Sequence, residues 1–490
     1  LKEAELFTRK AIKIKPDYAE AHSNLGIILR KVGRLKEAEL STRKAIEIKP
    51  DYADAYSNLG NILIDLGKPK EAELPLRKAI EIKPESADNH FNLGLTMKDF
   101  GKPQEAELLF RQAIENKPDF AEAYSNLGGI LLELGKLKEA ELSLLKAIKI
   151  KPDFAKAYFA LSTINQTNFN QIWMETLFSE NILNTTSKKD QIDLFFARSN
   201  ILHQEKKYKE SSKYLEIANN YKLDIQSSNP ERLICQSKLL LGKSNTQEIN
   251  KQEYLNSPES IFIVGMFRSG STLLESILSM NNSVNALGEV DILEHSFLKY
   301  QQRSNVLTLA ELYWEMTTNN PTNLKITTNK MLYNYQYAGI ICGQIPNSKI
   351  VHCIRNPLDN ILSIYRANFA TKEAYFSSLI DCTKIYLDQD NIMNEYKKRF
   401  RSNIYDLDYD LLVRNPNEEI KSLISWLGWK WDDIYLSPHL NQRSVSTASN
   451  IQVRSQINSK SVGGWKNYRE MLKPAIEILV KTDKYRELFS

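Results

Sequence analysis

A 34-residue repeat in the first third of the chain constrains the fold more than any other feature of the sequence. The hexapeptide LKEAEL begins at residues 1, 35 and 137, and the variants PKEAEL and PQEAEL begin at 69 and 103. A period of this length predicts a two-helix unit. One helix is expected over about 17–31 and ends at Gly33, and a second begins near Leu35 and stops before Pro50. Proline cannot continue the second helix, so it sets the turn into the next repeat.

Residues 1–160 resemble the tetratricopeptide repeat, which implies an all-α helical repeat solenoid with a peptide or protein partner. Every repeat carries an asparagine in SNLG or FNLG, and two interpretations of these side chains stay open. They form the solvated polar face of the first helix, or they line a groove and offer amide donors and acceptors to a peptide backbone. The second interpretation resembles the asparagine ladder of repeat domains that feed protein substrates to a glycosyltransferase. The residues concerned are Asn24, Asn58, Asn92 and Asn126.

The rest of the chain loses this period. Residues 161–245 keep helical signals and are expected to be degenerate repeats or capping helices, and the polar stretch 246–258 is the predicted linker. Because Leu1 opens a second helix, we expect at least one first helix to lie upstream, together with any targeting segment.

Composition narrows the class of protein. With 42% apolar and 26% charged residues and no apolar run near the roughly 20 residues of a membrane span, we expect a soluble protein. A net charge of +5 over 490 residues predicts no nucleic-acid surface. The four cysteines lack metal or disulfide spacing, which favours reduced, buried thiols in a cytoplasmic protein.

Residues 259–490 predict an α/β domain. Short apolar runs near 260, 324, 348 and 402 alternate with helical stretches, which is typical of a parallel, doubly wound sheet with its ligands at the carboxyl ends of the strands. Behind the first run lies GMFRSGST, where Gly265 and Gly270 have the spacing of a P-loop but Ser271 replaces its lysine. Loss of that lysine argues against ATP or GTP hydrolysis. The N–H groups of 269–272 would instead face an anion at the start of a helix, with Arg268 supplying charge.

Two segments resemble the sulfotransferases that use 3′-phosphoadenosine 5′-phosphosulfate (PAPS). FRSGSTLLESIL looks like their 5′-phosphosulfate loop, and IVHCIRNPLDNILSIY looks like their 3′-phosphate element. The resemblance implies donor contacts from Arg268, Ser269, Gly270, Ser271, Thr272, Arg355 and Ser363. Arginine suits a terminal phosphate because its guanidinium can donate two parallel bonds. A structural ion pair is the alternative role for Arg355.

Over residues 258–480 the chain is most similar to tyrosylprotein sulfotransferases and to bacterial proteins that join tetratricopeptide repeats to such a domain. The resemblance implies that Glu289 removes the acceptor proton and that Lys330 assists the leaving group, although Asn329 and Leu332 depart from the family pattern. It also implies donor contacts from Tyr409, Ser449 and Lys466.

These patterns predict a PAPS-dependent sulfotransferase without a metal, whose acceptor is a protein tyrosine and whose product is adenosine 3′,5′-bisphosphate. A saccharide or small-molecule hydroxyl and a non-catalytic repeat scaffold with a nucleotide-binding domain stay open as alternatives. A helix-start position is the alternative for Glu289, and His295 and His352 are rival bases that we expect to be packing residues.

Overall fold

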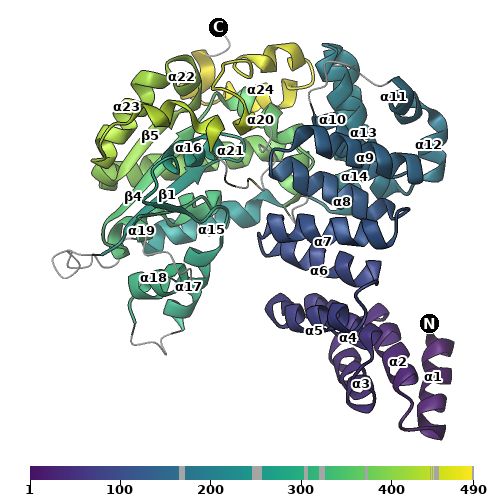
Figure 1. Ribbon diagram of the computed structural model, residues 1–490. Coiled ribbons are helices and arrows are strands. Elements are labelled where there is room, and N and C mark those ends of the chain that lie inside the picture. Colours follow the sequence, from purple (N-terminus) through teal and green to yellow (C-terminus); the bar gives the residue numbers. More distant parts are fainter. Residues whose placement is uncertain are drawn as a thin grey trace. The chain divides into compact units, whose positions relative to one another are not determined.

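The computed structural model describes residues 1–164, 171–244, 257–302, 307–318, 326–369, 373–441, 443, 445 and 452–487 (Figure 1). The chain splits into two compact units, Leu1–Thr185 with Ser444–Ser446, and Thr186–Arg443 with Thr447–Ser490. Residues 186–245, predicted from sequence as capping helices, thus share the second unit. The predicted linker lies outside the described residues except for its last two positions.

The first unit is a series of helix pairs. In each of four pairs an odd-numbered second helix packs on the preceding first helix, as α3 does on α2. The elements are α1 (Lys2–Ile14), α2 (Ala19–Lys31), α3 (Leu35–Ile48), α4 (Ala53–Asp65), α5 (Pro69–Ile82), α6 (Ala87–Asp99), α7 (Pro103–Asn116), α8 (Ala121–Glu133), α9 (Leu137–Ile150), α10 (Ala155–Thr163), α11 (Gln171–Phe178) and α12 (Glu180–Thr185).

The repeat positions explain this packing. Gly33 has φ +81° and lies two residues beyond α2, where a left-handed residue closes a helix, as the sequence predicts. Leu25, Leu29 and Ala38 join Ile62 of the next repeat in one buried cluster. Each repeat therefore completes the core of its neighbour, which is why the array needs several copies.

The second unit contains a five-stranded sheet in the order β2-β3-β1-β4-β5, and every pairing is parallel. The strands are β1 (Glu259–Gly265), β2 (Val284–Ala286), β3 (Ile326–Asn329), β4 (Ser348–Ile354) and β5 (Ile404–Asp408). The register sets Gly265 beside Cys353, so β1 and β4 end together. The three-residue β2 escaped the sequence reading because so short a strand has too few positions to show a pattern.

Helices cover both faces of the sheet, which makes the fold doubly wound. Phe262 and Val264 of β1 point into one core with α15, α17, α19 and α21, while Ile261 and Ile263 point into the other with α16 and α23. The remaining elements are α13 (Lys188–Gln204), α14 (Tyr208–Ile225), α15 (Pro230–Lys243), α16 (Ser271–Leu278), α17 (Ile292–Gln301), α18 (Leu309–Thr318), η2 (Leu332–Tyr337), α19 (Ala338–Gln344), α20 (Pro357–Tyr365), η3 (Ala374–Ser377), α21 (Leu379–Phe400), η4 (Arg401–Asn403), α22 (Tyr409–Arg414), α23 (Pro416–Leu427), η5 (Asp433–Leu436), η6 (Pro438–Leu440), η7 (Gln452–Arg454), η8 (Gly464–Tyr468), α24 (Lys473–Leu479) and α25 (Asp483–Arg486).

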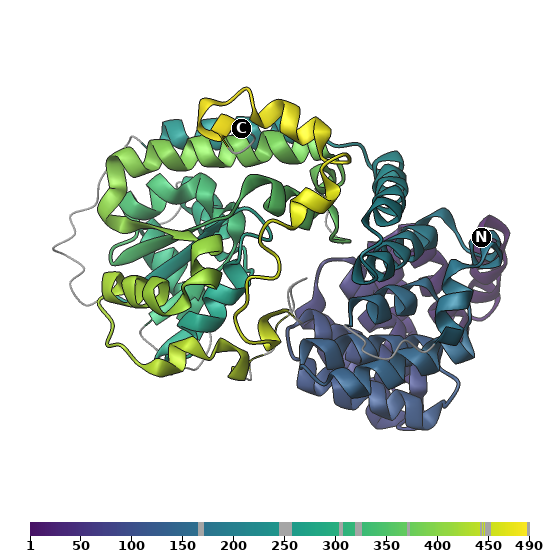
Figure 2. The ribbon, with the colours of Figure 1, turned by 90° about the horizontal axis from the view of Figure 1, so that it is seen from above.

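The C-terminal helices return to this domain. In Figure 2 the long green helix is α21, and the yellow C-terminal segment lies beside it. Lys484 of α25 pairs with the buried carboxylate of Asp390 at 2.6 Å. Among the described helices, none combines the length and the apolar character needed to cross a membrane.

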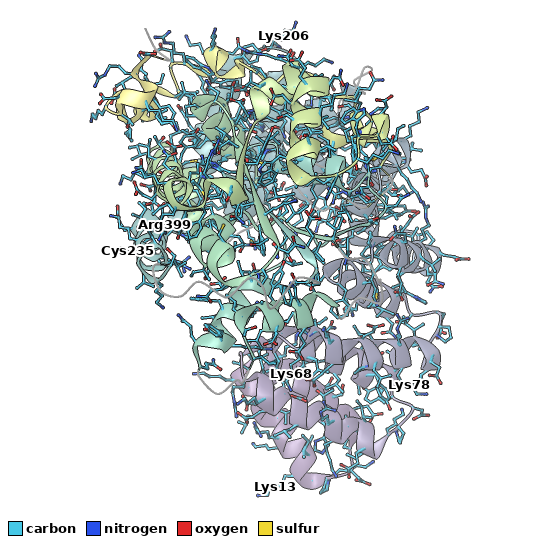
Figure 3. The ribbon with its side chains drawn as sticks, turned by 90° about the vertical axis from the view of Figure 1, so that its left-hand side faces the viewer. Lys13, Lys68, Lys78, Lys206, Cys235 and Arg399 are labelled. Atoms are coloured by element: carbon cyan, nitrogen blue, oxygen red, sulfur yellow. The ribbon has the colours of Figure 1, made fainter. Side chains whose placement is uncertain are left out.

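The expectation that all four cysteines are buried is wrong for Cys235, which is exposed on α15 (Figure 3). The buried face of this helix carries Leu233, Ser237 and Leu240, and a residue two positions after Leu233 points away from that face.

Candidate active site

The turn between β1 and α16 presents backbone N–H groups, and we call residues 265–272 the anion loop. Arg268 and Gly270 both have positive φ, +65° and +96°, and α16 begins at Ser271. A Cβ on Gly270 would lie 2.3 Å from the Cδ2 atom of Tyr409, so only glycine fits there. The first N–H groups of α16 have no partner within the helix and lie at its positive dipole end, which suits an anion.

Two arginines from different strand ends meet at this turn. Arg268 donates from Nε to Ser363 Oγ of α20 at 3.1 Å, and Arg355, which follows β4, donates to the carbonyl oxygen of Arg268 at 2.8 Å. The guanidinium of Arg355 lies 4.7 Å from the ring centroid of Tyr409. Arg268, which the sequence assigns to the 5′-phosphosulfate, thus lies beside Arg355 and Ser363, which it assigns to the 3′-phosphate.

The electrostatics of this pair favour an anion. Burial and, to a smaller extent, the positive charge of Arg355 lower the pKa of Arg268 to about 10. The Nε of Arg355 is buried and has no hydrogen-bond partner among the described residues. Two neighbouring guanidiniums repel each other, and a buried donor without a partner lowers the stability of the folded protein. A bound anion would relieve both effects.

A C-terminal segment closes over Arg355. Its guanidinium donates to the carbonyl oxygen of Ser461 at 3.1 Å, and the Ser461 hydroxyl lies 3.0 Å from the Tyr409 hydroxyl. Asp359 of α20 holds this segment by accepting from the N–H groups of Gly463 and Trp465, at 2.6 and 2.9 Å.

The sequence reading missed Ser461 and Asp359, because their partners lie about a hundred residues away. The glycine pair of SVGGW was the available signal for this close approach. Lys466 is exposed on η8. Ser449 lies outside the described residues.

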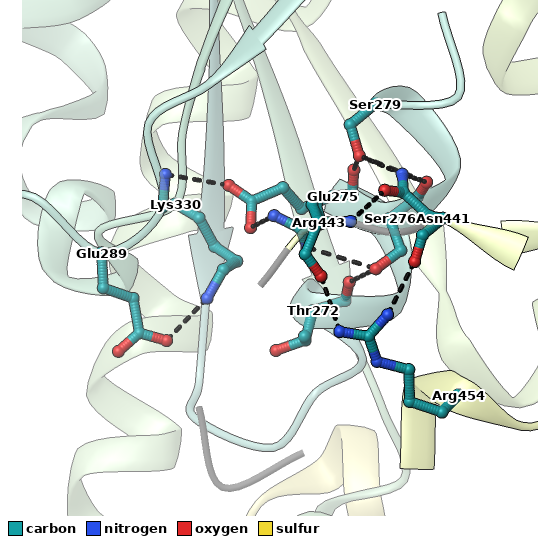
Figure 4. Close-up of polar contacts among 10 residues, drawn as sticks. Thr272, Glu275, Ser276, Ser279, Glu289, Lys330, Asn441, Arg443 and Arg454 are labelled. Atoms are coloured by element: carbon teal, nitrogen blue, oxygen red, sulfur yellow. Dashed lines mark hydrogen bonds and ion pairs between the residues drawn. The ribbon is translucent and has the colours of Figure 1, made fainter. Parts of the chain in front are cut away.

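Glu289 and Lys330 form an ion pair at the end of β3 (Figure 4). Lys330 Nζ lies 2.6 Å from Glu289 Oε1, and their side chains are 1% and 38% exposed. Burial raises the pKa of the Cys353 thiol to about 12, and the nearby charge of Lys330 opposes this rise. Because Cys353 is the register partner of Gly265, Lys330 lies close to the anion loop.

Glu275, which the sequence reading also missed, supports the loop that carries Glu289. Its buried carboxylate accepts from the N–H of Gly288 at 3.2 Å and from Arg443 at 2.8 Å (Figure 4). The same helix that opens the anion loop therefore fixes the residue before Glu289. A charged residue within the apolar helix 271–278 was the signal that could have revealed it.

Aromatic rings gather around Phe267 of the anion loop. The rings of Tyr333, Phe369 and Phe376 have centroids 5.3, 5.7 and 5.1 Å from that of Phe267. Tyr333 follows Lys330 by three residues, and its hydroxyl lies 3.2 Å from that of Tyr375. The loop and the Lys330 segment therefore share one aromatic wall.

A hydrogen-bond chain behind the site joins α13 and α14 to α20 and η8. Arg366 donates to His203 Nε2 at 3.1 Å, so Nδ1 carries the proton and donates to the Tyr468 hydroxyl at 2.8 Å. Tyr468 lies 3.0 Å from Ser211 Oγ, which donates to the carbonyl oxygen of Ser199. Burial and, to a smaller extent, the charge of Arg366 lower the pKa of His203 to about 3. His203 is therefore neutral in the folded protein.

The rival bases lie elsewhere. His295 is on α17 with Nδ1 2.7 Å from the carbonyl oxygen of Asp291, and His352 is buried in β4 between Asp406 and Gln389, at 3.0 and 2.6 Å. Within the described ranges, no cluster of three or more His, Cys, Asp or Glu side chains has a metal-binding arrangement.

Two of the four repeat asparagines link neighbouring repeats. Asn58 donates to Ser23 Oγ at 3.1 Å and Asn92 to Ser57 Oγ at 3.3 Å, whereas Asn126 donates to the carbonyl oxygen of Glu122. These residues are half-buried, while Asn24 is exposed. Some of these side-chain amides therefore donate hydrogen bonds between neighbouring repeats. Neither interpretation from sequence included this role.

Parts of the chain match known protein families. Residues 258–433 match the model of the sulfotransferase family, and residues 19–52, 53–86 and 91–153 match tetratricopeptide repeat models. The chain joins tetratricopeptide repeats to a sulfotransferase-family domain.

An uncharacterized protein of Aquifex aeolicus (strain VF5) is 32% identical over 247 residues, which is 46% of this chain and 32% of that protein. The chain thus spans about a third of the length of this curated relative. Two solved structures are similar to the repeats. YrrB, a TPR protein with an unusual peptide-binding site, is 25% identical, with a TM-score of 0.31 over 41% of this chain and 97% of its own. MamA from Desulfovibrio magneticus RS-1 is 18% identical, with a TM-score of 0.29 over 31% and 85%.

Proposed function

We propose that this protein transfers the sulfuryl group of PAPS to the hydroxyl of a peptide or protein tyrosine, and that the repeats bind this acceptor. The observation that carries the proposal is the meeting of Arg268 and Arg355 with Ser363 at the start of α16. Two guanidiniums, a hydroxyl and a helix N-terminus form a set of donors that suits a nucleotide with phosphate groups at both ends.

The residues present fit this donor. Arg355 and Ser363 would bind its 3′-phosphate, and the spare Nε of Arg355 gives that arginine a further donor. The N–H groups of 269–272 and Arg268 would bind the 5′-phosphosulfate. Tyr409 closes this region, since it contacts Gly270, Arg355 and Ser461. Ser449 and Lys466 stay predictions as donor contacts.

The chemistry would use the pair at the end of β3. PAPS, when bound, supplies a sulfuryl group whose bond to the bridging phosphate oxygen breaks as a bond to the acceptor oxygen forms. Glu289 would take the acceptor proton through its partly exposed carboxylate. Lys330 would donate to the bridging oxygen as negative charge grows there. Because its ammonium group is buried away from water, it would stabilise this charge more than an exposed ammonium would.

The aromatic wall around Phe267 favours a phenolic acceptor over a saccharide. Phe267 of the anion loop and Tyr333 of the Lys330 segment both contribute rings to this wall, and a tyrosine ring can pack against them edge to face. The domain arrangement that we propose follows the sequence, with a repeat array over 1–160, helical capping elements over 161–245, a linker over 246–258 and the transferase over 259–490.

Thermal unfolding with adenosine 3′,5′-bisphosphate and with ATP tests the proposal. A ligand at about one hundred times its Kd stabilises the folded state by about 2.7 kcal/mol. We expect the bisphosphate to raise the Tm and ATP to have little effect. Arg355→Ala and Arg268→Ala should lose this rise, whereas Glu289→Ala should keep it and lose transfer from radiolabelled PAPS to a tyrosine peptide. Stabilisation by ATP alone would indicate a kinase, and no response to the bisphosphate would indicate a non-catalytic scaffold.

A further inference from the structure

An ion pair connects the C-terminal ends of two successive first helices, and the same charge pattern recurs further along the array. Arg30 near the end of α2 lies 2.6 Å from Asp65, the last residue of α4. The same two repeat positions recur as Lys98 of α6 and Glu133 of α8. Burial raises the pKa of Glu133, and the charge of Lys98 opposes this rise, so these two groups are also near each other. A cation of one repeat thus faces a carboxylate of the next.

The intermediate pair lacks its cation. The position of Arg30 and Lys98 is occupied in α4 by Ile64, and the carboxylate that should face it is Asp99. Asp99 is exposed at the end of α6 and forms no ion pair with any described residue. The array therefore has one carboxylate whose expected partner is an isoleucine.

A cavity of about 250 Å³ lies at this gap. Its walls come from α2, α4 and α6, three first helices in a row, and include the asparagine of the third repeat, Asn92. The lining residues are Arg30, Asn61, Ile64, Asn92, Leu95, Thr96 and Asp99.

The lining fits a long side chain with a positive end. Ile64 and Leu95 can pack against a methylene stem, and the carboxylate of Asp99 and the amide oxygens of Asn61 and Asn92 can accept from a cation. Arg30 also reaches this cavity, but Asp65 balances its charge. Among the lining residues the cation is Arg30, which Asp65 already pairs, so a negative ligand would meet the carboxylate of Asp99 without a counter-charge from this lining.

We propose that this cavity binds a lysine or arginine side chain of the protein segment that the repeats present, so that the ligand supplies the cation missing between α4 and α6. The inference rests on the proposed function for the identity of that segment as the acceptor. A basic residue in the same segment as the tyrosine would then contribute to substrate choice.

Fluorescence anisotropy with the full chain, without sulfuryl donor, tests the proposal. The probe is a fluorescein-labelled peptide of glycine and serine with one tyrosine and one lysine, compared with the same peptide carrying glutamine or glutamate in place of lysine. Because a partly exposed charge pair contributes up to about 1 kcal/mol, we expect the lysine peptide to bind about 3- to 5-fold more tightly than the glutamine peptide. The glutamate peptide should bind more weakly than both.

Two variants remove the preference in different ways. Asp99→Asn deletes the carboxylate, and Ile64→Arg supplies the missing cation from within the array. Both should bind lysine and glutamine peptides equally. Leu74→Arg, which adds the same charge at a 76% exposed position of α5, should keep the wild-type preference. If Ile64→Arg does not fold, Asp99→Asn and Leu74→Arg decide the question.

Equal binding of all three peptides to the wild type would overturn the inference, as would a lysine preference that survives both variants. The bisphosphate thermal shift of each variant separates this result from the proposed function. Wild-type protein that binds the bisphosphate but shows no lysine preference refutes only the cavity assignment. A lysine preference without bisphosphate binding refutes only the transferase.

Discussion

Loss of Glu289 should lower the free energy of unfolding more than loss of Lys330, its partner in the ion pair. Lys330 is 1% exposed and Glu289 is 38% exposed, with 2.6 Å between their charged atoms. Removing one member of a fully buried pair costs about 3–5 kcal/mol, because the other charge is left without compensation. Since water reaches Glu289, we expect Glu289→Gln to lower the free energy of unfolding by about 1–3 kcal/mol. Lys330→Met removes the buried charge itself and should cost less than about 1 kcal/mol.

Thermal unfolding of the two variants and of the double variant measures this asymmetry. A loss of 1 kcal/mol lowers the Tm of a domain of this size by about 2–4 °C, so Glu289→Gln should lower it by about 2–12 °C. The double variant should be more stable than Glu289→Gln alone, because no buried ammonium remains. Adenosine 3′,5′-bisphosphate should reduce the deficit of Glu289→Gln, since its 5′-phosphate would provide a counter-charge to Lys330. Equal losses in both single variants would refute the reasoning.

Two further predictions concern Arg355, which we propose binds the nucleotide, and the buried His203. Arg355→Lys keeps the charge but loses the planar donors and the stacking on Tyr409, so bisphosphate affinity measured by calorimetry should fall about tenfold or more; unchanged affinity would mean that Arg355 is structural. His203 has a folded pKa of about 3 against about 6.5 when unfolded, so the unfolded state binds the proton first and stability falls as the pH drops below about 6.5. Between pH 6.5 and 5, urea unfolding should show a loss of about 2 kcal/mol that His203→Gln lacks, and equal losses in both proteins would contradict the neutral buried state.

The sequence carried enough information for the fold class because the relevant signals are local. A 34-residue period, a glycine after each first helix and a proline after each second one define helix pairs without knowledge of distant contacts. The apolar runs that became β1 and β4 and the octet that became the anion loop are equally local. Neighbouring residues set the conformation of each of these stretches, so the sequence alone was sufficient to predict them.

Parts of the candidate site escaped the sequence because they depend on contacts between distant segments. Glu275 supports Gly288 from another element, Asp359 holds Gly463 across the domain, and His203 acts on α20 from a helix that sequence reading assigned to the repeats. The residues that flank them in the chain do not indicate which distant residues they contact.

By itself the sequence determined that helical repeats precede an α/β domain, and it predicted that Arg268, Arg355 and Ser363 belong to phosphate-binding elements. Only the tertiary structure decided that these three residues touch, that Lys330 is buried against Glu289, and that Asp99 faces an isoleucine where its neighbours face cations. The physical reason is that local conformation follows from neighbouring residues, whereas burial and charge pairing depend on which distant surfaces the packed core brings together.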